Sequence, residues 1–275
     1  IVVAPEFLRQ YSMCGDPADR SCYEIAVLEE PEGRGGSQLM HRIFEPGRRV
    51  FVSKPINHFE LELSAKLSLL FGGGIGVTPM VAFAHELHRK GGDFRLMYSA
   101  SQKSTAAFDG AFDGLAWADR VSRHYSDQGT RLDIARAVPP YYAGTHIYVC
   151  GPDAYMSAIL DHARSKGYPE AALHAEFFTV PELPEWENHP FEIERANGQK
   201  IPVTATQSAS DALIAAGIAV DVKCADGLCG VCKCTVLSGE VEHRDFVLSA
   251  AQRETTVILC QSRAAKPGGV LKLDI

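Results

Sequence analysis

Apolar stretches of strand length alternate with helical patterns through the middle of this chain. The three predicted strand–helix pairs are Leu67 to Phe71 with Thr78 to Arg89, Phe94 to Ser99 with about Thr105 to Ala116, and Thr145 to Cys150 with Asp153 to Lys166. Leu173 to Phe178 has the pattern of a closing strand. Alternation at this spacing predicts an α/β domain with a parallel sheet and helices on both faces.

The first 63 residues have a different, β-rich pattern. Three predicted strands lie between turn-forming residues: Phe7 to Ser12, Tyr23 to Leu28 and Arg49 to Ser53. One short helix is expected from about Ser37 to Phe44, with Ser37 able to cap it. The pattern predicts an antiparallel β-barrel or sheet. Because the chain opens inside a strand pattern at Ile1, we expect the barrel to be incomplete at its N-terminal side.

The last third of the chain follows a Pro-rich break. Pro181 to Glu185 interrupts all periodicity, so we assign 181–189 to a linker. Beyond it, Asn197-Gly198 separates two β-rich runs, which is a strong hairpin signal. A helix near Ser210 to Ala216 and strands near Lys233 to Leu237 and Thr256 to Leu259 complete the pattern. The predicted domains are therefore 1–63, 64–180 and 190–275, with the linker before the last.

Composition excludes several classes of protein. The chain is 46% hydrophobic and 22% charged, which is typical of globular domains and not of disorder. Its formal charge of −7 makes binding to nucleic acid phosphates a poor hypothesis. No apolar run approaches the roughly 20 residues of a membrane span, and no signal peptide pattern opens the chain, so we expect a cytoplasmic protein that binds neither membrane nor nucleic acid.

Five of the eight cysteines fall in the last quarter of the chain. Four of them, Cys224, Cys229, Cys232 and Cys260, have the spacing of a plant-type 2Fe-2S ferredoxin. Gly227 permits positive φ, which allows the loop to fold tightly around a cluster. A structural zinc site is the alternative, but no later CxxC or His pair accompanies Cys260. The fifth cysteine, Cys234, is interpreted as a small hydrophobic residue without a ligand role.

Two glycine-containing turns follow strands of the predicted parallel sheet. Gly72 to Pro79 connects a strand to a helix, where exposed N–H groups and a positive dipole end suit a pyrophosphate, although a purely structural glycine turn is the alternative. Cys150-Gly151-Pro152 ends a second strand. Because ligands of such sheets bind beyond the carboxyl ends of the strands, both turns are predicted to line one crevice. Cys150 as a wall of a nicotinamide pocket is favoured over Cys150 as a nucleophile, since no partner motif accompanies it.

Arg9 and Tyr11 are predicted on one face of the same early strand. An Arg can neutralise a phosphate and a Tyr can cover an aromatic ring, so this strand offers contacts for both ends of a flavin mononucleotide. Gly35-Gly36-Ser37 adds an anion site at a helix start.

Taken together, these motifs resemble the phthalate dioxygenase reductase family, the flavin and iron–sulfur reductases that serve Rieske oxygenases such as vanillate O-demethylase. The resemblance covers essentially the whole chain and rests on motifs in a fixed order: Arg9 to Ser12, Gly33 to Ser37, Gly72 to Pro79, Cys150 to Pro152, Glu176 to Phe178, and the four spaced cysteines. It implies an FMN-binding barrel first, an NAD-binding domain second and a ferredoxin domain of β-grasp type last. By that resemblance about 40 further residues are expected before Ile1.

The resemblance also implies the site residues and the reaction. The expected FMN contacts are Arg9, Tyr11, Ser12, Gly36 and Ser37; the expected nicotinamide contacts are Gly74, Thr78, Cys150, Gly151 and Pro152; and the expected catalytic residues are Cys150 and Ser12. Electrons from NADH would pass through FMN to the 2Fe-2S cluster and then to a partner oxygenase. NADH is favoured over NADPH because Lys103 is the only basic residue from 99 to 104.

Three alternatives stay open at this point. The same three-domain unit also forms the reductase part of self-sufficient haem-thiolate monooxygenases, in which the acceptor is fused to the chain. A non-catalytic redox sensor would also bind nucleotide and cluster, but it needs no flavin between them. A zinc-binding adaptor would be colourless. The reductase itself is expected to be a monomer.

Overall fold

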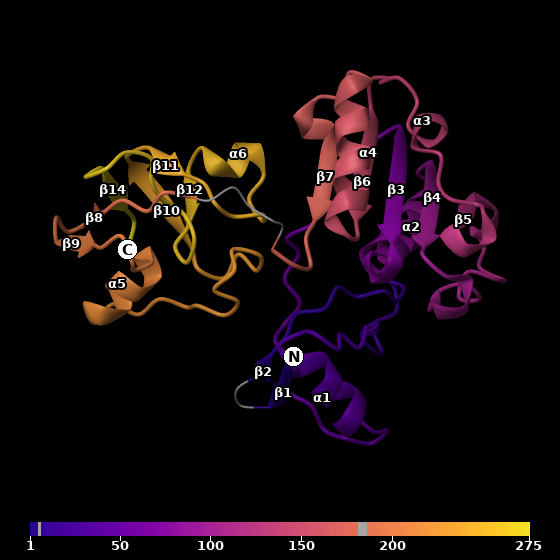
Figure 1. The fold of residues 1–275 in the computed structure, drawn as a ribbon, viewed down its shortest axis with the longest axis horizontal. Helices are drawn as coiled ribbons and strands as arrows, with labels where there is room; N and C mark the ends of the chain where they lie inside the picture. The colour runs from indigo at the N-terminus through magenta and orange to yellow at the C-terminus, as the bar shows by residue number, and fades with distance from the viewer. Residues whose placement is uncertain (5–6, 181–185) are drawn as a thin grey trace. The chain divides into compact units, whose positions relative to one another are not determined.

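In the computed structural model, which describes residues 1–4, 7–180 and 186–275, five strands form one parallel sheet (Figure 1). They are β3 (Leu67–Gly73), β4 (Phe94–Ala100), β5 (Val121–Tyr125), β6 (Thr145–Cys150) and β7 (Leu173–Glu176), in the order β5-β4-β3-β6-β7. All four neighbouring pairs are parallel. The predicted parallel sheet is confirmed, and β5 is a strand that the hydrophobic pattern did not indicate.

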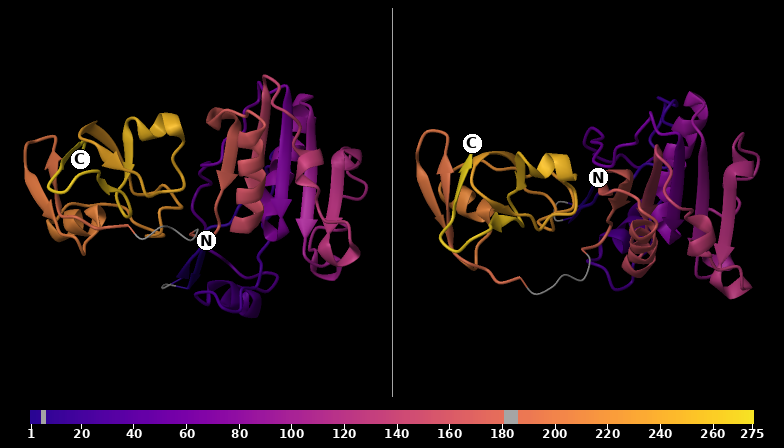
Figure 2. Two further views of the ribbon diagram at one scale, coloured as in Figure 1. Left: turned by 45° about the horizontal axis from the view of Figure 1, so that its top comes forward. Right: turned by 90° about the horizontal axis from the view of Figure 1, so that it is seen from above.

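Helices cover both faces of this sheet, which Figure 2 shows from two further sides. Helix α2 (Val77–Lys90) packs on one face and α4 (Asp153–Ser165) on the other. Successive side chains of a strand point to opposite faces. Accordingly, Leu70 belongs to the core beneath α2, whereas Leu69 and Phe71 belong to the core beneath α4. The mostly apolar sequence of β3, in which Ser68 is the one polar side chain, thus follows from burial on both sides.

The prediction of a helix over Thr105 to Ala116 is wrong. The described chain there consists of turns, preceded by η2 (Lys103–Thr105) and followed by η3 (Ala118–Arg120). Phe108 and Phe112 still pack into the core beneath α2. Gly114, at φ 82°, reverses the chain after them. Buried aromatic residues at helical spacing are therefore delivered by consecutive turns, which periodicity alone does not distinguish from a helix.

The N-terminal stretch is only partly regular. Strands β1 (Val2–Ala4) and β2 (Phe7–Leu8) pair antiparallel. The predicted strands around Ile25 and Phe51 are reduced to single antiparallel bridges, to Met13 and Val2 respectively. Helix α1 (Gly36–Ile43) is present, but Gly35 is its N-cap, and the Ser37 hydroxyl accepts a hydrogen bond from the Glu30 N–H instead of capping the helix.

The C-terminal stretch folds as an α+β unit with a five-stranded mixed sheet, β12-β10-β14-β8-β9. Its strands are β8 (Phe191–Arg195), β9 (Lys200–Val203), β10 (Lys233–Ser238), β12 (Thr256–Ile258) and β14 (Val270–Leu273). The predicted hairpin at Asn197-Gly198 is confirmed, with Gly198 at φ 83°. Helix α5 (Ala209–Ala215) starts at a Ser208 capping box. The remaining elements are β11 (Val241–Glu242), β13 (Arg263–Ala264) and α6 (Ala250–Arg253).

Contacts divide the chain into two compact units. The first comprises Ile1–Pro55 and Phe59–Phe178, and the second comprises Ile56–His58 and Thr179–Ile275. Apart from residues 56–58 and 179–180, the predicted barrel and NAD-binding domain both lie in the first unit, and the boundary between them at residue 63 stays a prediction. Residues 181–185 of the predicted linker lie outside the described residues. Among the helices that the structure describes, none is long and apolar enough to cross a bilayer.

Candidate functional site

The two predicted catalytic residues meet through a third residue at the carboxyl ends of two strands. Cys150 ends β6 and Glu176 ends β7, and the two are paired in register. The Ser12 hydroxyl donates a 2.7 Å hydrogen bond to Glu176 Oε2. The strand predicted from Phe7 to Ser12 ends at Leu8, so Arg9 and Tyr11 lie in the irregular segment after β2. The Ser12 hydrogen bond attaches this segment to the end of the nucleotide sheet.

Burial raises the pKa values of both Cys150 and Glu176. It raises the pKa of the Cys150 thiol well above its usual value, and the carboxyl of Glu176 raises it further. Burial also raises the pKa of Glu176, which the Ser12 hydrogen bond opposes. A thiol that stays protonated is a poor nucleophile, so Cys150 suits a small uncharged pocket wall better than covalent catalysis. The sequence analysis named Glu176 only as part of a motif and assigned it no role. Its place in the predicted closing strand was the one signal that could have brought it to the site.

The two glycine turns pack directly against each other. A Cβ on Gly76 would lie 2.4 Å from the Cys150 carbonyl oxygen, and one on Gly151 would lie 2.9 Å from the Gly73 Cα. Gly74, in contrast, has a φ of 56°, and a Cβ added to it would have no other atom within 4 Å. Packing therefore explains Gly76 and Gly151, while Gly74 leaves its backbone open at the start of η1 (Gly74–Gly76), as a phosphate site requires.

Thr78 lies in the first turn of α2 and is buried. Its hydroxyl donates to the Ile75 carbonyl at 2.9 Å, so in this structure it stabilises the turn itself. Pro152 precedes α4, and its ring lies 3.1 Å from the position of a Cβ on Gly73. The predicted nicotinamide contacts are thus held in one continuous turn–turn assembly, in which Thr78 shapes the turn.

Arg9 lies against the N-terminus of α1. A Cβ on Gly36 would fall 2.4 Å from Arg9 Nε, so only glycine leaves room for the guanidinium there. Arg9 Nη1 donates to the Leu8 carbonyl at 2.9 Å and Nη2 to the Arg34 carbonyl at 3.2 Å. Helix N-terminus and guanidinium together form a cationic position suited to a phosphate.

Tyr11 is half-buried close to Arg9. Burial raises the pKa of the Tyr11 hydroxyl, and the charge of Arg9 acts in the opposite direction. A ring next to a cationic group at a helix start fits the two ends of a flavin mononucleotide, phosphate and ring system. Arg9, Tyr11, Ser12 and Gly36 are the residues whose geometry fits this cofactor.

An acidic residue that the sequence pattern did not single out follows β5 and contacts the segment after β4. Asp127, in η4 (Ser126–Gln128), accepts from the Lys103 N–H at 3.2 Å, and its own N–H donates to the Ser101 carbonyl. The Lys103 ammonium lies 4.0 Å from Asp109 Oδ2. A carboxylate here suits ribose hydroxyls and repels a 2′-phosphate.

The cysteine-rich loop of the second unit is tightly folded. Ala225, Gly227 and Gly230 have positive φ values of 58°, 75° and 63°. The Asp226 N–H points at Cys224 Sγ at 3.3 Å. Leu259 N–H donates to the Cys232 carbonyl at 3.1 Å, which holds the segment of the fourth cysteine against the loop.

The four predicted ligand thiols interact in pairs. Hydrogen bonds from Cys229 and Cys260, then backbone N–H groups, lower the pKa of Cys224, and a hydrogen bond from Cys260 lowers the pKa of Cys232 to about 7. Within the described chain, no three His, Cys, Asp or Glu side chains are arranged to hold one metal ion. Paired thiols with the Asp226 N–H directed at Cys224 Sγ fit a two-iron cluster, in which each iron takes two thiolates.

The loop is packed closely on two sides. A Cβ on Gly227 would lie 3.1 Å from Gln261 Cγ, and one on Gly230 would lie 2.9 Å from the His58 ring. Burial, and then the charge of Lys233, lowers the pKa of His58. His58 was not indicated by the sequence pattern, because nothing local connects it to a loop far along the chain.

Cys234 projects from β10 and packs against the core of the second unit. Its Sγ lies 3.7 Å from the carbonyl oxygens of Thr235 and Asp274. Burial raises the pKa of its thiol. These surroundings favour a protonated Cys234 thiol that serves in packing.

Comparison with known proteins gives a family model and close relatives. The model of the 2Fe-2S iron–sulfur cluster binding domain matches residues 192–265, which include all four spaced cysteines. The vanillate O-demethylase oxidoreductase of Pseudomonas sp. (strain HR199 / DSM 7063) is 39% identical over 272 residues, covering 97% of this chain and 86% of that protein.

Two solved structures are similar over almost the whole chain. An intact type IV self-sufficient cytochrome P450 monooxygenase superposes with a TM-score of 0.89 at 36% identity, covering 97% of this chain. This chain spans 35% of that longer enzyme. Phthalate dioxygenase reductase, described as modular for electron transfer from pyridine nucleotides to [2Fe-2S], superposes with a TM-score of 0.63 at 33% identity, covering 96% of this chain and 83% of its own.

Proposed function

The chain belongs to the phthalate dioxygenase reductase family, and from that premise we propose that it transfers electrons from NADH through FMN to a 2Fe-2S cluster and on to a partner oxygenase. The observation that carries this proposal is the Ser12–Glu176 hydrogen bond beside Cys150. It connects the region suited to a flavin with the strand ends suited to a nicotinamide, inside one compact unit.

Within that unit, each residue has a distinct role. Arg9 and the first turn of α1 would hold the FMN phosphate, and Tyr11 would cover the ring system. We place these residues in a barrel-type flavin domain, for which β1, β2 and the two antiparallel bridges are the described elements. The Ser12 hydroxyl would hold the flavin ring while it donates a hydrogen bond to the Glu176 carboxylate.

At the strand ends, Cys150 and Gly151 would form the wall against the nicotinamide, and Gly74 would expose N–H groups to the pyrophosphate. Because Cys150 is buried, the wall that it forms would exclude water from a bound nicotinamide. When bound, FMN accepts an electron pair and releases single electrons, which the one-electron cluster requires. Cys224, Cys229, Cys232 and Cys260 would hold that cluster, and the loop amides would tune its potential.

The proposal is tested by anaerobic titration with NADH, followed by absorbance. Bleaching of both flavin and cluster bands by stoichiometric NADH is the expected result. An unchanged spectrum in a protein loaded with both groups would overturn the reductase function and favour a sensor.

A second candidate function is specifically favoured by the P450 similarity. In it, the same chain is the reductase part of a haem-thiolate monooxygenase, and only the acceptor differs. Reading the complete coding sequence decides between a fused haem domain and a separate oxygenase.

Three further properties belong to the proposal. NADH is the donor, because Asp127 presents a carboxylate where NADPH carries a phosphate. The reductase acts as a monomer, which light scattering of the purified protein tests. It works in the cytoplasm, where thiols for cluster assembly stay reduced.

A further inference from the structure

A side-chain amide next to the fourth spaced cysteine reaches into the cysteine-rich loop. Gln261 directly follows Cys260, and its Nε2 donates a 2.6 Å hydrogen bond to the Ala225 carbonyl oxygen. The amide must present its nitrogen here, because an amide oxygen cannot donate to a carbonyl. Ala225 lies between Cys224 and Cys229. The bond therefore joins the segment of the fourth cysteine to the loop that carries the first two.

The accepting carbonyl belongs to the same peptide group as an N–H that is directed at sulfur. The Ala225 carbonyl and the Asp226 N–H are the two polar ends of the peptide bond between these residues. The bond is trans, so the two ends point in opposite directions. The Asp226 nitrogen lies 3.3 Å from Cys224 Sγ. Gln261 thus holds the outer end of a peptide group whose inner end points at a predicted ligand.

This peptide group needs a restraint, because Ala225 has an unfavourable backbone conformation. Its φ of 58° lies in the left-handed region, and no other non-glycine residue of the described chain has a positive φ. A residue with a Cβ keeps such a conformation only where its surroundings hold it. The Gln261 hydrogen bond is one such restraint. Without it, the peptide group can turn so that the Asp226 N–H leaves the sulfur.

A second peptide group of the loop is held in the same manner. The Phe246 N–H donates to the Gly227 carbonyl at 3.2 Å. The Leu228 N–H, at the other end of that peptide group, is a hydrogen-bond donor to the Cys224 thiol. The Phe246 donor is a backbone group, which a change of side chain leaves in place. The donor to Ala225 is a side chain, so it is the part of this arrangement that a substitution can remove.

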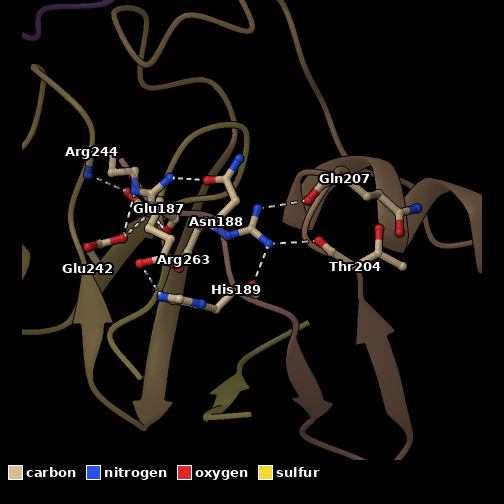
Figure 3. Close-up of polar contacts among 9 residues, drawn as sticks. Glu187, Asn188, His189, Thr204, Gln207, Glu242, Arg244 and Arg263 are labelled. Atoms are coloured by element: carbon tan, nitrogen blue, oxygen red, sulfur yellow. Dashed lines mark hydrogen bonds and ion pairs between the residues drawn. The ribbon is translucent and has the colours of Figure 1, made fainter. Parts of the chain in front are cut away.

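Two buried arginines fix the backbone that carries Gln261 (Figure 3). Arg263, two positions further on, donates to three backbone carbonyls, those of His189, Thr204 and Gln207. The Arg244 N–H donates to Ser262 Oγ at 3.2 Å, and Arg244 Nη1 donates to Asn188 Oδ1 at 2.6 Å. Because its backbone is already fixed, the Gln261 side chain loses little further freedom when it forms its hydrogen bond.

We propose that Gln261 is a positioning residue that raises the reduction potential of the cluster, because it keeps the Asp226 N–H directed at the Cys224 sulfur. This inference rests on the proposed function, in which the spaced cysteines hold a 2Fe-2S cluster. Reduction adds one electron, given up by the reduced flavin, and breaks no bond, so the cluster and its thiolates gain one negative charge. An N–H directed at a sulfur stabilises that charge. Gln261 acts through the peptide group and not as a ligand.

The size of the effect is limited by one hydrogen bond. A neutral hydrogen bond of this kind corresponds to a factor of roughly 2 to 13 in an equilibrium constant, and only the part that differs between the oxidised and reduced forms changes the potential. Removal of the Gln261 donor should therefore shift the one-electron equilibrium roughly 2- to 10-fold toward the oxidised cluster, which corresponds to a potential lower by about 18 to 59 mV.

The test is a redox titration with dithionite, followed by EPR, of the full chain loaded with both cofactors. Gln261→Met keeps the length of the side chain and removes the donor. Gln199→Met is the matched control, because Gln199 Oε1 accepts a 2.8 Å hydrogen bond from Arg195 in the β8–β9 hairpin, outside the loop. Gln261→Met should lower the potential by about 18 to 59 mV, and Gln199→Met should leave it unchanged.

A second variant separates the donor from the packing of the side chain. Gln261→Glu has the size of the natural residue but offers an oxygen where the Ala225 carbonyl needs a donor, and it adds a negative charge. Its potential should fall at least as far as that of Gln261→Met.

Three results would each overturn the proposal: an unchanged or higher potential in either Gln261 variant, an equal fall in Gln199→Met, or failure of both Gln261 variants to assemble a cluster. The last result would make Gln261 a residue of cluster assembly. If the unaltered protein reduced by dithionite lacked the EPR signal of a 2Fe-2S cluster, the cluster assignment in the proposed function would fail instead.

Discussion

Replacing Gly36 with Ala tests how the chain holds the FMN phosphate. The added Cβ would lie 2.4 Å from Nε and 2.7 Å from Cζ of Arg9, far inside van der Waals contact. The colliding atoms belong to the end of a flexible side chain, so the backbone of α1 can stay in place while the guanidinium moves away. We therefore expect Gly36→Ala to imitate Arg9→Ala in flavin binding while the protein remains folded.

The size of the effect follows from the lost contact. A hydrogen bond to a charged group contributes about 1.5 to 3 kcal/mol. Its loss corresponds to roughly 10- to 150-fold weaker FMN binding. Ala favours a helix over Gly by up to about 1 kcal/mol. The free energy of unfolding of the apoprotein should therefore not fall by an amount comparable with the loss in FMN binding.

Fluorescence titration of the apoprotein with FMN and with riboflavin measures the effect. Riboflavin lacks the phosphate, so its affinity should be insensitive to Gly36→Ala and to Arg9→Ala. The double variant should bind FMN no more weakly than Arg9→Ala, because one guanidinium accounts for both losses. Equal losses for FMN and riboflavin, or additive losses in the double variant, would refute the assignment of Arg9 to the phosphate.

Three other outcomes are expected. Cys229→Ser should abolish the cluster absorbance and cytochrome c reduction but leave NADH–ferricyanide activity, whereas Cys234→Ser should keep the cluster; loss of ferricyanide activity in FMN-loaded Cys229→Ser would contradict the separation of the two sites. Burial raises the pKa of Glu176 above its ordinary 4.5, so its contribution to stability is present below that pH and is lost as the pH rises through the folded-state pKa. Urea unfolding of Glu176→Gln between pH 4.5 and 8 should therefore lack this decline, which for one titrating carboxyl is at most about 1.4 kcal/mol per pH unit, and an unchanged pH slope would argue against a buried ionisable carboxyl. NADH should give a higher kcat/KM than NADPH, and Lys103→Ala should change the NADH value by less than about fivefold, as for an exposed ion pair; a preference for NADPH would reverse the donor assignment.

Much of the fold was accessible from local pattern. Strands β3, β4 and β6 are buried on both sides, so their apolar runs stand out, and the Asn197-Gly198 hairpin has its own turn signal. Strand β5 lies at a sheet edge and has three consecutive polar residues, Ser122 to His124, so it gives no such run. The turns around Phe112 imitate a helical pattern because buried aromatic residues recur there without a helix.

The site was predictable where chemistry depends on spacing in sequence. The cysteine spacing required no tertiary information, and Cys150 followed from a motif at a strand end. Arg9 followed from a predicted strand that the structure ends at Leu8. The hydrogen bond from Ser12 to Glu176 joins residues 164 positions apart, and the attachment of Arg244 to Asn188 joins residues 56 apart. Such pairs arise from folding, so no window of sequence contains both members.

The distribution of contacts separates the two kinds of electron transfer. The groups proposed for the two-electron step, Ser12, Cys150 and Glu176, are fixed within one unit by a hydrogen bond and strand register. The one-electron step ends in the other unit, which holds the four spaced cysteines. Hydride transfer needs reacting atoms held within a few tenths of an ångström, whereas a single electron tolerates a range of approaches. Because Glu176 and the four cysteines lie in different units, changes at Glu176 should act on flavin reduction and changes at the cysteines on cluster reduction.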